Sequence, residues 1–422
     1  MQVKKNREGN YFFYMLMSFV AMTISLYFYD TFFLQSDNMN QFKEDREAYY
    51  SDLQEKDSGS IKVGIVWPFM IGDAVSDYFK EGILLAQKEI NEKGVLGKKI
   101  EVDFQDDRWE QEKAESIAKK YARDSTVLAV IAHDDETLAI PASITYDYSG
   151  LIMISPAVSY PLFTRKDFNY IFRNTASDID IAEVLTYASH YLNFNKVVVL
   201  SFRHNRYSET LAQNFMENAI LNNIKIIYDN QIVLAVDDES EKKSISKKSN
   251  ELEIISDIFP SNSNKVDYDA IFIAGIEESV VPFIKKAREK GIYAPFITGD
   301  ALDIPNLESY GKEMDDIIIA SLFNVERVNE KTQNFVQTFK KEYGFLPDTW
   351  AAQGYDAMML LVQAIKNANS LNPELITTEL HYMRNFQSIF GPYSLTPRGD
   401  VIGRKLYVKI FKDGHFNYIN FK

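Results

Sequence analysis

The sequence contains no cysteine, and this absence removes several kinds of chemistry at once. Without a thiol there is no disulfide, no thiolate nucleophile, no cysteine-ligated metal and no lipid attached through an N-terminal cysteine. Histidine is also scarce, because the five histidines lie far apart and show no metal-ligand spacing. We therefore expect neither a metal centre nor another cofactor.

The glycine-rich and nucleophile motifs of common enzymes are missing as well. The sequence has no Gly-x-Gly-x-x-Gly, no phosphate-binding Gly-Lys-Ser/Thr loop, no Gly-x-Ser-x-Gly elbow and no His-Glu-x-x-His. The adjacent acids Asp106–Asp107 and Asp315–Asp316 do not form acid/base pairs, because neighbouring side chains in a strand or loop point apart. A hydrolase or dehydrogenase is not indicated.

Positive charge is in deficit, with 46 Lys and Arg against 60 Asp and Glu and a net charge of -14. No long basic stripe interrupts this balance, so nucleic acid is an unsuitable partner. The chain is long, however, at 422 residues of which 46% are hydrophobic. Because one core usually organises roughly 100–200 residues, two globular lobes are expected.

The N-terminus predicts a membrane anchor. Three basic side chains within residues 1–10 precede a charge-free, mostly apolar run from Tyr11 to Tyr29. Extended to Leu34, a helix here would rise about 36 Å, enough to cross a bilayer core, with residues 1–10 in the cytoplasm and the rest outside. The alternative is a cleaved signal peptide, although Tyr29–Phe33 offers no small-x-small cleavage site.

Two polar segments are interpreted as solvated connections. Residues 35–60 alternate in charge and show no sustained apolar face, which favours a polar tether over the alternative of a frayed helix and places the start of the fold at Ile61. Residues 237–248 form a run of charges and serines, which predicts a surface-loop insertion.

From Ile61 onward, short apolar β-branched runs alternate with segments of helical periodicity. After the run at Ile61–Trp67, apolar residues at Phe79, Ile83, Ala86 and Ile90 recur at helical spacing. The alternation continues twice along the chain and predicts an α/β protein with two doubly wound lobes. Further strands are expected at residues 127–132, 151–155, 170–173, 196–201, 225–228, 270–274 and 296–298, and further helices at 110–122, 139–148 and 208–222.

Several short motifs occur in a recognisable order. They are Ile90-Asn91-Glu92-Lys93-Gly94, Pro141-Ala142-Ser143, Ile154-Ser155-Pro156-Ala157, Phe172-Arg173 before Asp178, Gln353-Gly354-Tyr355-Asp356-Ala357, and Phe390-Gly391 before Gly399-Asp400. Together they make the chain resemble the type I periplasmic solute-binding proteins, whose best-known members bind leucine, isoleucine and valine. The resemblance covers Ile61 to nearly the C-terminus.

The resemblance implies two lobes joined by three crossovers near Asp178, Asn324 and Gly399. Residues 61–178 and 325–398 would form the first lobe, and residues 179–324 and 399–422 the second. Such proteins close on a solute between the lobes and present it to the permease of an ABC transporter, so no catalysis is expected. The alternative is a membrane-anchored receptor of the same fold that reports ligand occupancy to a signalling partner.

The family site carries over onto particular residues of this chain. Ala157 and Ser159 would hold a ligand carboxylate, although the same segment is also typical of a simple turn. Asp178 and Asp300 would hold an ammonium, with a helix N-cap as the alternative role of Asp178. Tyr207 would cover the ligand from the second lobe.

The sequence departs from the family pattern where a hydroxyl should meet the ligand. Glu136 stands in that place, so either Thr137 donates instead, or the ligand has no free carboxylate, or the pocket has changed toward cations. Ile276 replaces a family tyrosine, and Trp67 is the candidate aromatic wall of the first lobe. A small amino acid, amide or amine is therefore the expected ligand class.

Overall fold

The structure is a computed structural model that describes residues 39–71, 74–75, 77–164, 168–233, 250–258, 267–304 and 307–419. The expected membrane segment at residues 11–34 and the expected loop at 237–248 both lie outside the described residues. Among the helices that are described, none is both long and apolar enough to cross a membrane.

The first lobe is built on a five-stranded parallel sheet of order β4-β1-β5-β6-β7. All six residues of its middle strand β5 are buried, because helices cover both faces of the sheet. This explains the continuous apolar runs in the sequence. The strands are β1 (Ser60–Val66), β4 (Lys99–Gln105), β5 (Val127–Ala132), β6 (Ile152–Ser155) and β7 (Ile171–Arg173).

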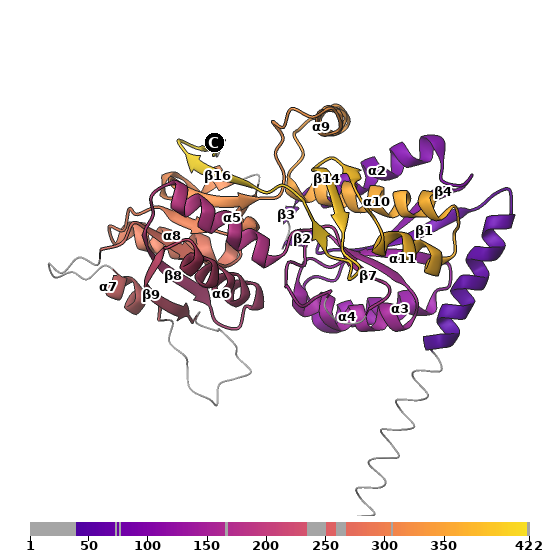
Figure 1. Ribbon diagram of the computed structural model, residues 1–422, viewed down its shortest axis with the longest axis horizontal. Helices are drawn as coiled ribbons and strands as arrows, with labels where there is room; N and C mark the ends of the chain where they lie inside the picture. Colours follow the sequence, from indigo (N-terminus) through magenta and orange to yellow (C-terminus); the bar gives the residue numbers. More distant parts are fainter. Residues whose placement is uncertain are drawn as a thin grey trace, which may run out of the picture.

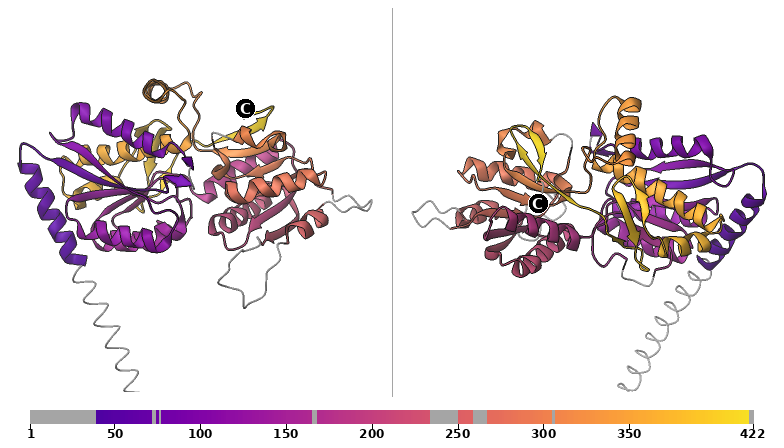
Figure 2. Two further views of the ribbon diagram at one scale, coloured as in Figure 1. Left: turned by 180° about the vertical axis from the view of Figure 1, so that it is seen from behind. Right: turned by 45° about the horizontal axis from the view of Figure 1, so that its top comes forward.

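Two groups of helices enclose this sheet, one on each face (Figure 2). On one face α2 (Phe79–Lys93) packs closely on α10 (Thr349–Ala368), because Gly82 has no side chain: a Cβ there would lie 2.0 Å from the Ala351 carbonyl oxygen. The lobe also contains α3 (Gln111–Arg123), α4 (Glu136–Tyr148), α9 (Glu330–Tyr343) and α11 (Pro373–His381), together with a helix over residues 39–55.

The second lobe is built on a seven-stranded sheet of order β17-β16-β12-β11-β10-β8-β9. Its strands are β8 (Lys196–Phe202), β9 (Lys225–Ile232), β10 (Ala270–Ile273), β11 (Phe296–Thr298), β12 (Ile317–Ser321), β16 (Tyr407–Lys412) and β17 (His415–Tyr418). The first five are parallel, whereas β16 and β17 are antiparallel. Its helices are α5 (Asp178–Tyr191), α6 (Arg206–Leu221), α7 (Glu251–Ile258), α8 (Glu277–Glu289), η2 (Asp300–Leu302), η3 (Leu307–Tyr310) and η4 (Lys312–Met314).

The chain passes between the two lobes three times, at residues 174–178, 322–329 and 403–406. The last passage lies a few residues beyond the expected position, because the Gly399 carbonyl accepts a hydrogen bond from the Arg173 N–H at 3.0 Å and so stays with the first lobe. The first lobe also carries two small antiparallel sheets, made of β2 (Met70–Ile71) with β3 (Ala74–Val75), and of β13 (Phe386–Ser388), β14 (Gly391–Leu395) and β15 (Val401–Ile402).

One arginine ties the three passages together. The Arg404 guanidinium donates to the carbonyl oxygens of Asn174 and Leu322, one from each of the other two passages. It also donates to the Gln353 side-chain oxygen at 3.0 Å, and it lies over the ring of Phe390, 3.5 Å from the centroid. The three connections therefore share a single bonded centre at the hinge.

Most of the segment interpreted as a tether is instead a helix. Residues 39–55 are helical and lie along the outer end of the first lobe, away from the second lobe (Figure 1). Tyr50 and Leu53 are buried, and the Tyr50 hydroxyl donates to the Thr126 carbonyl at 2.7 Å. The interpretation of residues 39–55 as a spacer was wrong, because the face that packs on the lobe includes a fully buried arginine.

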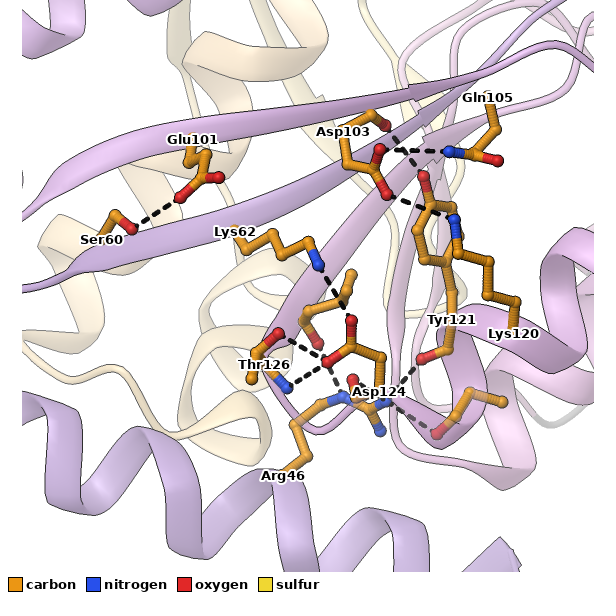
Figure 3. Close-up of polar contacts among 12 residues, drawn as sticks. Arg46, Ser60, Lys62, Glu101, Asp103, Gln105, Lys120, Tyr121, Asp124 and Thr126 are labelled. Carbon is orange, nitrogen blue, oxygen red and sulfur yellow. Dashed lines mark hydrogen bonds and ion pairs between the residues drawn. The ribbon is translucent and has the colours of Figure 1, made fainter.

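That arginine, Arg46, is bonded only to backbone oxygens (Figure 3). Its guanidinium donates to five carbonyls, at distances from 2.5 to 3.3 Å, which belong to Val127, Ser149, Tyr121, Ala122 and Asp124. These carbonyls lie at the ends of α3 and α4 and at the start of β5, where helices leave orphan acceptors. Burial lowers the pKa of Arg46 to about 10, which still leaves it charged at neutral pH.

Candidate ligand-binding site

A cavity of about 380 Å³ lies between the two lobes, at the carboxyl ends of the parallel strands of both sheets. This is the edge where α/β sheets expose loops and helix starts to ligands. Eight of the nine sequence-predicted site residues line it. They are Trp67, Glu136, Thr137, Ala157, Ser159, Tyr207, Ile276 and Asp300.

Asp178 is the predicted site residue that does not line the cavity itself. It is 1% exposed and lies directly behind Ser159, whose carbonyl accepts the Asp178 N–H at 2.9 Å. Burial raises the pKa of Asp178 to about 7, although a hydrogen bond with the Ser159 side chain opposes this shift. The alternative role of Asp178 as N-cap of α5 was wrong, because the Ser177 hydroxyl caps the helix by accepting the Asp180 N–H.

Glu136 begins α4 and is turned inward. The residue is 4% exposed, and its carboxylate oxygen Oε1 has no hydrogen-bond partner among the residues that the structure describes. Burial raises the pKa of Glu136 to about 8, and the nearby charge of Asp135 adds to the shift. Glu136 is therefore turned into the protein and not into solvent.

Thr137 follows Glu136 but is exposed, and its hydroxyl already has a partner. Asp135 caps α4 by accepting both the Thr137 N–H, at 2.7 Å, and the Thr137 hydroxyl. Thr137 lines the rim of the same cavity, so both residues considered for the family's hydroxyl position are present there. They differ in that only Glu136 has an unpaired buried atom.

The loop after β6 combines two roles that the sequence left open. The Ser155 hydroxyl accepts the Val158 N–H at 3.2 Å, so the segment is a stabilised turn. The same turn presents Ala157 and Ser159 to the cavity. A turn and a ligand-facing loop are therefore not alternatives here.

In the second lobe, the Tyr207 hydroxyl donates to Asp300 Oδ1 at 2.9 Å. This approach depends on Gly299, since a Cβ at that position would lie 2.1 Å from the tyrosine hydroxyl oxygen. Burial raises the pKa of Asp300 to about 6, while the hydrogen bond from Tyr207 opposes that shift. Asp300 thus reaches the cavity already held in one orientation.

Several lining residues were not identified from the sequence. In the first lobe they are Asp77, Trp109, Asp134, Asp135, Leu138 and Trp350, and in the second lobe Glu277, Glu278, Ala301 and Ile304. Glu277 and Glu278 lie directly after Ile276, at the start of α8, a position that the strand-end rule would have found. Trp109 comes from the turn between β4 and α3 and Trp350 from the first turn of α10, and no periodic signal in the sequence places either of them at the cavity.

On the first-lobe wall of the cavity, Asp134 and its neighbour His133 are each held by a hydrogen bond to another side chain. His133 is fully buried and lies 2.8 Å from Asp107, so this histidine is a satisfied structural residue. Asp134 accepts a hydrogen bond from the Trp109 indole N–H, and burial raises its pKa well above the usual range. No group of three or more potential ligands in the described part of the chain is arranged to hold a metal ion.

A family model described as the receptor family ligand binding region matches residues 79–408. The chain belongs to this family. It is 31% identical to the ABC transporter substrate-binding protein of Desulfitobacterium hafniense, solved in complex with Leu, over 86% of this chain and 100% of that one, with a TM-score of 0.73. A leucine binding protein from Thermotoga maritima, at 24% identity, covers 85% of this chain and 98% of its own with a TM-score of 0.74.

A curated relative gives the same class. The Leu/Ile/Val-binding protein homolog 1 of Brucella suis biovar 1 (strain 1330) is 25% identical over 367 residues, which is 85% of this chain and 93% of the relative. The protein is therefore an extracytoplasmic solute-binding protein of the ABC transporter class and not an enzyme. These relatives do not favour the alternative of a signalling receptor.

Proposed function

We propose that this protein captures a small amine-bearing solute in the cavity between its lobes, closes on it and delivers it to an ABC permease. The observation that carries the proposal is the cavity itself, which draws Glu136 and Ser159 from the first lobe and the Tyr207–Asp300 pair from the second. A carboxylate beyond a strand end is a suitable partner for an ammonium group.

Closure follows from a ligand that contacts both lobes. Such a ligand favours the closed state by its extra contacts there, and the equilibrium moves only as far as that difference in affinity allows. Arg404 holds the three passages of the hinge next to one another, because it bonds to backbone oxygens of both other passages. The permease would then recognise the closed arrangement.

We also propose that residues 11–34 anchor the protein in the membrane with the lobes outside the cytoplasm. The apolar length of the segment and its basic flank support this. Full-length protein should remain with membranes after carbonate washing and run at its uncleaved mass. A mature N-terminus near Ser36 would contradict the anchor.

The ligand proposal is tested by calorimetry on full-length protein with Asp300→Ala. We expect the variant to lose affinity for an amine-bearing ligand by about 100-fold or more while its thermal transition persists, since the side-chain partner of Asp300 is Tyr207, another residue that lines the cavity. Tyr207→Phe keeps the carboxylate and serves as the matched control, with a smaller loss. Unchanged affinity in Asp300→Ala would remove this residue from the site.

A further inference from the structure

The charge of the cavity is one-sided. Seven acidic residues line it, and no Lys, Arg or His from the described part of the chain does so. Four of the acids lie on the first lobe, between Asp77 and Glu136, and three on the second, namely Glu277, Glu278 and Asp300. Both walls that face the ligand therefore carry the same sign.

Unpaired buried atoms within this cluster point to a missing partner. Glu136 is 4% exposed, and within the described part of the chain neither its Oε1 atom nor the buried Oδ1 atom of Asp134 has a hydrogen-bond partner. Immediately behind the first wall, Oδ1 of the buried Asp178 is also without a partner. Burying a carboxylate is costly unless it is paired, so a cation in the cavity would supply the partner that the lining residues Glu136 and Asp134 lack, and its charge would also favour the ionised form of Asp178 behind them.

The distribution of the acids decides what kind of cation fits. A compact metal ion requires several ligands at one point, and the described residues hold no such group. One ammonium group can pair with one wall only, and the two walls would still repel each other as the lobes approach. Two ammonium groups on one flexible chain can pair with both walls and draw them together.

The aromatic lining suits the carbon chain between such groups. The protein has three tryptophans, and all of them, Trp67, Trp109 and Trp350, line this cavity. The rings of Trp67 and Trp350 lie 5.6 Å apart between centroids, at an angle of 54°. Indole faces bind methylene groups by apolar contact and attract ammonium groups through the ring quadrupole.

We propose that the ligand is an aliphatic polyamine, with at least two ammonium groups and no carboxylate, bound between Glu136 on the first lobe and Asp300 on the second. This inference rests on the proposed solute-capturing function and narrows its ligand class. A simple amino acid would bring its own carboxylate toward Glu136 and is disfavoured by like-charge repulsion.

The test is calorimetry of full-length protein at pH 8 with four probes: 1,4-diaminobutane, spermidine, n-butylamine and leucine. We expect 1,4-diaminobutane to bind at least 30-fold more tightly than n-butylamine, which has the same chain and one charge. Leucine should bind most weakly. Binding should also change tryptophan fluorescence, because every tryptophan of the protein lines the cavity.

Variants locate the binding. Glu136→Gln should weaken 1,4-diaminobutane at least 10-fold, and Asp300→Asn should do so independently, whereas Glu253→Gln, an exposed acid on α7, should leave it unchanged. Equal affinity for n-butylamine and the diamine, or tighter binding of leucine, would overturn the polyamine proposal and leave solute capture intact. Diamine binding that all three variants retain and that salt abolishes would mean adsorption to the acidic surface and would also overturn it. Failure of all four probes and of a wider solute panel would count against solute capture itself.

Discussion

Helix α4 has a buried ionisable group at each end, and the two groups are bonded to very different degrees. At the C-terminal end Arg46 is 0% exposed and bonds to five carbonyls, including that of the C-cap residue Ser149. At the N-terminal end Glu136 is 4% exposed and keeps one oxygen unpaired. The charged form of each group has the sign that the helix dipole favours.

Completeness of bonding, rather than burial, separates a buried group that stabilises the fold from one that binds a ligand. A buried charge whose bonds are all made stabilises the fold that makes them, and removing it leaves several acceptors without donors. A buried charged group that has an atom without a hydrogen-bond partner lowers the stability of the protein until a ligand pairs with that atom. Variants at Arg46, Glu136 and Thr137 test this difference.

The largest effect is expected at Arg46. Arg46→Met should lower the free energy of unfolding by about 3–5 kcal/mol, because five buried carbonyl oxygens lose their donor. Urea unfolding measures the loss, and Arg46→Lys should recover only part of it, since an ammonium has three donors. Ligand affinity should stay within about 2-fold of the wild type. An unchanged urea midpoint would show that residues 39–55 are a tether after all.

At the other end of α4, removing the charge should stabilise the ligand-free protein. The pKa of Glu136 is raised to about 8 from an ordinary 4.5, so its contribution to stability is fully present below pH 4.5 and is lost as the pH rises through 8. Glu136→Gln should therefore be more stable than the wild type at pH 8, by about 1–3 kcal/mol, and similar to it at pH 4.5.

Other charges near Glu136 affect the size of this difference but not its direction. Asp135 and Asp178 raise its pKa and Arg206 lowers it, and Asp178 itself titrates at about 7 with the same sign. Urea midpoints at pH 4.5, 6.5 and 8, compared with those of Glu253→Gln, measure the effect. A wild type that is more stable than Glu136→Gln at pH 8 would mean that Glu136 has a structural partner.

Ligand binding should depend on pH with the opposite sign to ligand-free stability. A cation prefers the ionised forms of Glu136 and Asp178, whose pKa values lie at about 8 and about 7. Affinity for 1,4-diaminobutane should therefore rise by about 10-fold between pH 6 and pH 8.5, with protons released on binding. Calorimetry in two buffers of different ionisation enthalpy measures that release. Affinity that falls over this range would indicate a ligand carboxylate facing Glu136.

Much of the fold could be predicted because its strands are short apolar runs covered on both faces. Strand β5 is entirely buried and reads as Val-Leu-Ala-Val-Ile-Ala, which periodicity and composition identify directly. The helix over residues 39–55 could not be found in this way. Its packed face contains few apolar residues, and the contact depends on Arg46, which in a sequence is indistinguishable from a solvated charge.

The residues of the candidate site likewise fall into those that a local sequence pattern predicts and those that it does not. Ala157, Ser159 and Asp300 follow strands, and strand ends can be placed from the sequence. Trp350 reaches the cavity from the start of a helix almost 200 residues further along the chain than Ala157, and no local pattern encodes that contact. Nor does the sequence distinguish Asp300, which is paired with Tyr207, from Glu136, which has an oxygen without a partner.

The smallest effect is expected at Thr137, the neighbour that the family pattern offers as an alternative to Glu136. Its hydroxyl already donates to Asp135 and its side chain is exposed, so it has no unmet bond to give a ligand. Thr137→Ala should change diamine affinity by less than about 3-fold and lower the free energy of unfolding by about 0.5–1 kcal/mol, through a weakened α4 cap.

Leucine titrated against the wild type, Glu136→Ser and Thr137→Ala tests whether Glu136 or Thr137 contacts the ligand. Glu136→Ser should improve leucine binding, because it removes like charge and adds a hydroxyl donor. Tight binding of leucine by the wild type, lost only in Thr137→Ala, would assign the ligand contact to Thr137 instead of Glu136. Glu136 would then stabilise the fold, as Arg46 does at the other end of α4, and would not bind the ligand.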